Sequence, residues 1–275
     1  MPRTPSCVLT GSSVARVSDG HAVDRYVEIG SFTKVLTGTA LMRMAAAGLL
    51  DPDDPLERHL PAAPAGTGIT LRNLADHTSG LPRLPPGTSV RDPYAGFDRD
   101  ALHRLLGRLD RVVVRPPGRE EEYSNLGYAV LGAALVAAAG APYEELLAEH
   151  VLRPLDVAEV SVRPDAERRL LAPGWFGRDR RPWTMNGAIL PAGGLWATPR
   201  AVADLLVRLA VERRLGDPAP SWQTSGPLLW HNGATRDASL FAGAMADGRW
   251  VVVHRLNTDP EETDRAGIDI LRERS

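Results

Sequence analysis

The chain has 275 residues, 43% of them hydrophobic, with 32 basic and 34 acidic residues and a formal net charge of −2. This composition predicts a folded core in one large or two modest domains, and the interspersed charges exclude a basic face, so neither nucleic acid nor a membrane is an expected partner. One cysteine, Cys7, excludes an internal disulfide, no Cys/His cluster has metal-ligand spacing, and no signal-peptide or membrane-length apolar run occurs, so we expect a cytoplasmic protein without metal or cofactor.

Short β-like runs open the chain, at residues 7–10, 13–17 and 26–29. Asp19-Gly20 lies between the last two runs and is a hairpin signal, because both residues tolerate positive φ. A long apolar helix is then predicted from Ser31 to about Gly48.

Ser31 and Lys34 stand three residues apart at the start of this helix. This spacing puts both side chains on one face, so the hydroxyl and the amine can form a hydrogen bond. A deprotonated amine could take the serine proton during attack on a carbonyl, and burial would lower the amine pKa as that role requires. Lys34 is the only lysine in the chain. We therefore predict a nucleophile at Ser31 and a base at Lys34.

The middle of the chain is predicted to be helical. Thr70 is the expected N-cap of a short helix that ends at His77, where histidine is more often a C-terminal cap than a catalytic base. Tyr123 precedes an apolar helix, a place where tyrosine is usually a core residue. The predicted helices cover residues 70–77, 99–109, 126–139, 142–152 and 199–214, and residues 153–198 are irregular.

Strands return near the C-terminus, at 227–231, 239–245 and 250–256, with an Asp247-Gly248 hairpin and a closing helix at 259–274. Strands at both ends of the chain and helices between them predict an α+β fold of the α/β sandwich type. Residues 1–30 and 190–275 would form an antiparallel sheet flanked by helices. Residues 31–189 would form an inserted all-helical lobe, with the active site at the interface.

Three motifs occur in order: Ser31-Phe-Thr-Lys34, Tyr123-Ser-Asn125 and His231-Asn-Gly233. Together they resemble the Ser-x-x-Lys, Tyr-x-Asn and Lys/His-x-Gly motifs of the serine β-lactamase and penicillin-binding protein superfamily, in particular the class C β-lactamase-like hydrolases and esterases. The stretches 74–82 and 192–195 are similar to that family as well. The resemblance implies a β-lactamase/transpeptidase-like fold.

The resemblance also implies roles for the matching residues. Ser31 would be acylated, and Lys34 with Tyr123 would transfer protons during acylation and deacylation. The oxyanion hole would consist of the backbone N–H groups of Ser31 and Ala234. Substrate binding would fall to Asn125, His231, Asn232 and Gly233.

The third motif departs from the family pattern, because His231 stands where penicillin-processing members usually have lysine. A histidine is largely neutral at pH 7, which favours substrates without a carboxylate, although Arg236 could restore the charge. We expect hydrolysis of a small ester or amide. An acyltransferase, a β-lactam or D-alanyl peptide hydrolase, and a non-catalytic acyl-ligand-binding module are the alternatives, and the oligomeric state stays open.

Overall fold

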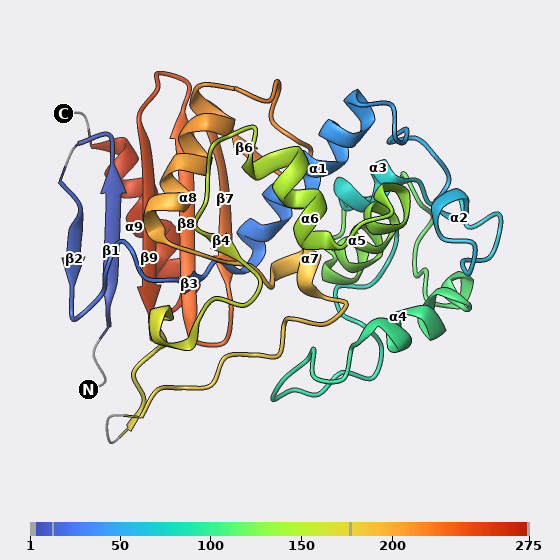
Figure 1. Ribbon diagram of the computed structural model, residues 1–275, viewed down its shortest axis with the longest axis horizontal. Coiled ribbons are helices and arrows are strands. Elements are labelled where there is room, and N and C mark those ends of the chain that lie inside the picture. The colour runs from blue at the N-terminus through green and yellow to red at the C-terminus, as the bar shows by residue number, and fades with distance from the viewer. Residues whose placement is uncertain (1–3, 13, 176–177, 274–275) are drawn as a thin grey trace.

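The computed structural model describes residues 4–12, 14–175 and 178–273. Positions 13 and 274, which fall in two of the predicted elements, lie outside this range. The main sheet is antiparallel and has the strand order β2-β1-β9-β8-β7-β6 (Figure 1). Its strands are β1 (Ser6–Thr10), β2 (Arg16–Ser18), β6 (Gln223–Ser225), β7 (Leu228–Ala234), β8 (Ala238–Met245) and β9 (Trp250–Leu256). The prediction of one antiparallel sheet built from both ends of the chain is confirmed.

A second, three-stranded sheet contains the strand that directly precedes Ser31 in the chain. Strand β5 (Trp196–Ala197) lies between β3 (Val27–Glu28) and β4 (Val160–Ser161). The predicted all-helical character of residues 31–189 is therefore wrong at β4, because this strand pairs with β5. The predicted Asp19-Gly20 hairpin is therefore wrong, because β2 pairs with β1 and β3 pairs with β5. Both turn residues do have positive φ, of 54° and 86°, but the turn leads the chain from one sheet to the other.

Helices α8 and α9 cover opposite faces of the main sheet, and the other helices gather beyond β7 and β6 (Figure 1). The helix that follows Ser31 is buried on nearly all sides, as its apolar sequence predicts. The helices are α1 (Thr33–Ala46), α2 (Leu56–His59), α3 (Leu71–Ala75), α4 (Arg99–Leu106), α5 (Asn125–Ala139), α6 (Tyr143–Leu147), α7 (Leu190–Gly193), α8 (Pro199–Leu206) and α9 (Pro260–Arg272). The helices at α6 and α8 each continue into a π-helical turn, Ala148–Leu152 and Val207–Val211.

Side-chain caps fix several helix starts. The Thr70 hydroxyl accepts a hydrogen bond from the backbone N–H of Asn73, and the Asn73 side-chain Oδ1 accepts one from the backbone N–H of Thr70, so the predicted N-cap of α3 is part of a capping box. Ser124 caps α5 by accepting from Gly127 N at 2.8 Å. This cap holds the start of α5 beside the predicted active site.

Within the described residues, no single helix is long and apolar enough to cross a membrane. The two helical segments Asn125–Ala139 and Tyr143–Leu152 are together long and apolar enough, by length and composition only, but the chain bends by 82° between them. The first helix of this pair is largely buried inside the protein.

Helix α9 packs closely on β8 because Gly267 has no side chain. A Cβ atom at this position would lie 2.2 Å from Cδ1 of the fully buried Phe241. We expect Gly267→Ala to lower the free energy of unfolding by about 1–3 kcal/mol through overpacking, despite the better helix propensity of alanine. Urea unfolding measures the change. Asp269→Ala, on the exposed side of α9, is the control and should change stability by less than about 0.5 kcal/mol; equal effects of the two variants would contradict the packing argument.

Candidate active site

The turn that carries Ser31, Gly30–Phe32, lies in backbone contact with the end of β7. Gly30 has a φ of +50°, and a Cβ atom on it would lie 2.7 Å from Ala234 N. A Cβ atom on Gly233 would lie 2.0 Å from Ile29 O. Any side chain at these two positions would push the turn and the strand apart.

The backbone N–H of Ala234 points toward the Ser31 turn. Thr235 N donates to Ala238 O at 2.9 Å, so these two residues form a hydrogen-bonded pair at the end of the β7–β8 hairpin. Hydrogen-bonded and non-hydrogen-bonded pairs alternate along antiparallel strands, so Ala234, opposite Ser239, directs its N–H away from β8. The two predicted oxyanion-hole donors therefore lie on the turn and the strand that approach each other.

Four of the predicted residues form one hydrogen-bonded group, which we call the Ser31 cluster: Ser31, Lys34, Tyr123 and Asn125. Lys34 Nζ lies 3.2 Å from Ser31 Oγ and donates to Asn125 Oδ1 at 2.8 Å. The hydroxyl of Tyr123 donates to Ser31 Oγ at 2.6 Å. The cluster joins the first turn of α1 to the start of α5.

The Lys34 amine is fully buried and has a third partner, the backbone oxygen of Ala192 on α7, at 2.6 Å. Burial, and then the positive charge of Arg83, lower the pKa of Lys34 well below its ordinary value. A neutral amine has two N–H groups and one lone pair. With Asn125 and Ala192 as acceptors for the two N–H groups, the lone pair is left for the hydroxyl of Ser31.

Tyr123 is a protonated donor at neutral pH. Burial raises the pKa of its hydroxyl to about 12, while the hydrogen bond to Ser31 and the charge of Arg83 act in the opposite direction. The guanidinium carbon of Arg83 lies 5.2 Å from the centre of the Tyr123 ring, and Lys34 Nζ lies 4.7 Å from it. The ring therefore has two basic side chains beside it.

Asn125 is held from both ends of its side-chain amide. Its Oδ1 accepts from Lys34, and its Nδ2 donates to the hydroxyl of Tyr94 at 2.8 Å. The Tyr94 ring meets the Trp183 ring edge to face at 6.0 Å. The spacing of the sequence motifs did not indicate Tyr94, because this contact joins segments that lie far apart in the chain.

The prediction that His77 caps the C-terminus of its helix is wrong. Helix α3 ends at Ala75, and His77 has a φ of +64°. Its Nδ1 accepts a hydrogen bond from the backbone N–H of Ser124 at 3.1 Å, and its ring lies 4.5 Å from the ring of Tyr123. His77 is thus a neighbour of the Ser31 cluster that the helix-end interpretation missed.

The side chains of His231 and Asn232 lie on opposite faces of β7, as alternation along a strand requires. His231 is fully buried, its Nδ1 lies 2.6 Å from Asn232 O, and burial lowers its pKa to about 4. Asn232 Nδ2 donates to Asp264 on α9 at 2.7 Å. The structure therefore does not bring the Asn232 side chain to the Ser31 cluster, in contrast to its predicted substrate-binding position.

Arg236 lies in the β7–β8 turn with about half of its side chain exposed. Its Nε is 3.8 Å from Asp237, and the same carboxylate receives Arg180 at 2.6 Å. Arg236 thus shares its nearest acid with another arginine.

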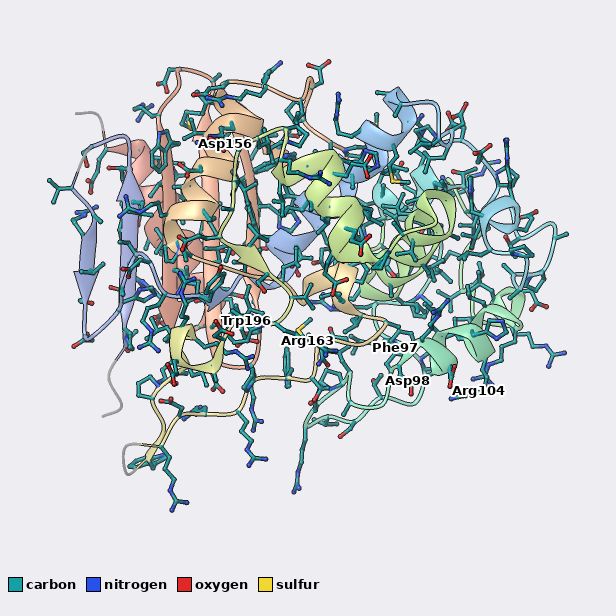
Figure 2. All side chains as sticks on the ribbon, in the orientation of Figure 1. Phe97, Asp98, Arg104, Asp156, Arg163 and Trp196 are labelled. Atoms are coloured by element: carbon teal, nitrogen blue, oxygen red, sulfur yellow. The ribbon has the colours of Figure 1, made fainter. Side chains whose placement is uncertain are left out.

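A cavity of about 450 Å³ adjoins the Ser31 turn through Gly193, since a Cβ atom there would lie 3.5 Å from Gly30 C. Trp196 and Arg163, both labelled in Figure 2, line this cavity beside the smaller sheet. Its volume suits a small organic molecule. The remaining lining residues include Glu28, Arg169, Arg181, Trp183 and Met185.

Across residues 4–12, 14–175 and 178–273, no group of three or more His, Cys, Asp or Glu side chains is arranged to hold a metal ion.

The family model described as Beta-lactamase matches residues 10–257. Among curated relatives, the D-alanyl-D-alanine-carboxypeptidase/endopeptidase AmpH of Escherichia coli K12 is 33% identical over 185 residues, which are 64% of this chain and 47% of that protein. A human beta-lactamase-like protein is 33% identical over 223 residues, 75% of this chain and 43% of its own length. The chain thus spans less than half the length of these relatives.

Solved structures show the same fold. A β-lactamase/D-alanine carboxypeptidase from Yersinia pestis, complexed with citrate, superposes with a TM-score of 0.78 at 22% identity and covers 97% of this chain and 92% of that one. The D-amino acid amidase from Ochrobactrum anthropi SV3 has a TM-score of 0.73 at 20% identity, with coverage of 98% and 94%. The predicted β-lactamase/transpeptidase-like fold is confirmed.

Buried histidines predict an acid-sensitive fold. Burial lowers the pKa of His21 and His231 to about 4 and of His77 to about 3, and it lowers the pKa of His254 well below its ordinary value. Between these values and about 6.5 the unfolded chain binds more protons than the folded one, so the free energy of unfolding falls as the pH falls. At pH 5 the loss is about 2 kcal/mol for each of His21, His77 and His231. Glu28 acts in the opposite direction. Burial raises its pKa to about 7, so its contribution to the free energy of unfolding is present at low pH and is lost as the pH rises toward 7.

We therefore expect the free energy of unfolding, measured with urea, to fall by several kcal/mol between pH 7 and pH 5. His231→Gln should reduce the slope by about one proton. A free energy that stays constant over this range would contradict the assignment of neutral, buried histidines.

Proposed function

This chain belongs to the beta-lactamase family, and from that premise we propose that the protein is a serine hydrolase that cleaves a small ester or amide through an acyl-enzyme at Ser31. The observation that carries the proposal is the Ser31 cluster, in which Ser31 Oγ is hydrogen-bonded to both the buried Lys34 amine and the Tyr123 hydroxyl. A serine is activated as a nucleophile by such an adjacent base.

In the acylation step, Ser31 Oγ attacks the carbonyl carbon and its proton passes to the lone pair of Lys34. The depressed pKa of Lys34 favours the neutral amine that can accept this proton. The negative charge that develops on the carbonyl oxygen is stabilised by the N–H groups of Ser31 and Ala234, and each such donor contributes about 3 kcal/mol in well-studied hydrolases.

When the tetrahedral intermediate collapses, the bond to the leaving group breaks and the leaving atom needs a proton. Tyr123 adjoins Ser31 Oγ and remains protonated at neutral pH, so it donates this proton and recovers one from the Lys34 ammonium. In deacylation a water molecule takes the place of the leaving group. Its proton moves back along the same pair, and the acid is released with Ser31 restored.

Asn125 is proposed to orient the carbonyl or amide group of the substrate while it holds Lys34. The third motif contributes mainly through its backbone, because His231 is buried and neutral and Asn232 is bound to Asp264. Gly233 allows the close approach of β7 to the Ser31 turn. These features support neutral acyl groups as the first substrate class.

Cleavage of a D-alanyl peptide or a β-lactam is the second candidate. Two observations favour it: the AmpH relative is named as a D-alanyl-D-alanine carboxypeptidase, and Arg83 and Arg236 offer positive charge that His231 does not. Arg236 is the residue to test, because Arg83 also lowers the pKa of Lys34 and its removal would affect every substrate.

We expect Ser31→Ala to lower turnover of p-nitrophenyl butyrate at least about 10⁴-fold, and Lys34→Ala comparably, because nucleophile and base act as a unit. Intact-mass spectrometry should show an acyl adduct in the wild type and none in Ser31→Ala. Ser89→Ala, at an exposed position, is the control and should behave like the wild type. Turnover that persists in a folded Ser31→Ala protein would overturn the proposed mechanism.

If the second candidate is correct, Arg236→Gln should lower kcat/KM for an N-acyl-D-alanyl-D-alanine about tenfold and leave the neutral ester within twofold, since a hydrogen bond to a charged group contributes about 1.5–3 kcal/mol. Arg214→Gln removes a distant surface cation and serves as the control. A loss that is equal for anionic and neutral substrates would exclude carboxylate recognition by Arg236.

A further inference from the structure

His77 is bonded to the chain on both sides of Tyr123. Its backbone oxygen accepts from Glu122 N at 2.8 Å, and its Nδ1 accepts from Ser124 N at 3.1 Å. These two bonds fix the residues immediately before and after the tyrosine. The loop that carries Tyr123 has little freedom to move relative to His77.

The His77 ring also contacts the tyrosine ring itself. The two ring centres are 4.5 Å apart, with an angle of 35° between the planes. The His77 ring also contacts the ring of Tyr128, at 5.1 Å between the ring centres. Tyr128 is itself fixed, since its hydroxyl donates to Ala75 O at 2.7 Å. His77 therefore connects Tyr123 to the buried part of α5.

The left-handed backbone at His77 shows that the surrounding structure imposes this arrangement. A φ of +64° is unfavourable for most side chains, although histidine and asparagine adopt it more often than others. The side chain that results is 9% exposed and points its Nδ1 at a backbone donor. Burial lowers the pKa of His77 to about 3, so that nitrogen remains an acceptor at neutral pH.

We propose, building on the function proposed above, that His77 is a positioning residue that holds the Tyr123 hydroxyl on Ser31 Oγ by clamping the backbone on both sides of the tyrosine and packing against its ring. The Tyr123–Ser31 bond is 2.6 Å long, and proton transfer depends steeply on such geometry. His77 itself touches no reacting atom of the Ser31 cluster.

Two substitutions test the contribution of the His77 side chain. His77→Ala removes both the acceptor and the ring, and His77→Asn keeps an acceptor and tolerates positive φ. His21→Asn is the matched control, because it removes a buried histidine whose ring bonds to His254 and not to the cluster.

The first readout is the ¹³Cζ resonance of Tyr123 in protein labelled at tyrosine Cζ, assigned among the five tyrosines with Tyr123→Phe. We expect His77→Ala to shift this resonance toward that of a tyrosine whose hydroxyl lacks its Ser31 partner, the value Ser31→Ala provides. His77→Asn should restore most of the wild-type position, and His21→Asn should leave it unchanged. An unchanged Tyr123 resonance in folded His77→Ala would overturn the proposal.

The second readout is the rate of ester hydrolysis. We expect His77→Ala to lower kcat about 100-fold with KM within about threefold, and His77→Asn to recover about tenfold of that loss. A loss in His21→Asn as large as in His77→Ala would mean general destabilisation and would overturn the positioning role. If the wild type forms no Ser31 adduct and has no turnover, the proposed function fails, while the Tyr123 resonance still decides whether His77 positions the tyrosine.

Discussion

A primary amine removed from solvent must find a partner for each of its hydrogen-bonding sites, and at Lys34 this requirement joins three elements of the fold. The amine lies on α1, Asn125 begins α5, and Ala192 O belongs to α7. Ser31 is the remaining partner. Because α5 and α7 both supply acceptors to the amine, the helices beyond the sheet are arranged around the first turn of α1. Tyr123 lies beside Ser31 because it directly precedes α5.

The sequence predicts the parts of this arrangement that are local. Three-residue spacing is enough to associate Ser31 with Lys34, and the apolar surroundings predict that the amine is buried. Tyr123 and Asn125 follow only from the motif resemblance, because no local spacing relates a loop at 123 to a helix at 31. The bond from Lys34 to Ala192 O could not be derived, since a backbone oxygen carries no sequence signal.

The predictions that are wrong share one physical cause, which is that contacts between distant parts of the chain override local sequence signals. Asp19 and Gly20 adopt the positive φ that their residue types favour, yet long-range pairing decides the partners of the flanking strands, which are β1 for β2 and β5 for β3. The predicted side-chain role of Asn232 ignored the alternation of faces along β7, which turns it toward Asp264. The position of His77 at a helix end predicts a cap, but its hydrogen-bond partner Ser124 is nearly fifty residues away.

The chain's single lysine gives the protein an unusual reactivity. Reagents that couple to lysine, such as amine-directed cross-linkers, biotinylation esters and immobilisation chemistries, meet no lysine amine at the surface, because Lys34 is fully buried. Any label that does arrive on Lys34 records an opening of the fold around α1, α5 and α7. The same side chain is therefore a built-in chemical reporter of local unfolding at the site.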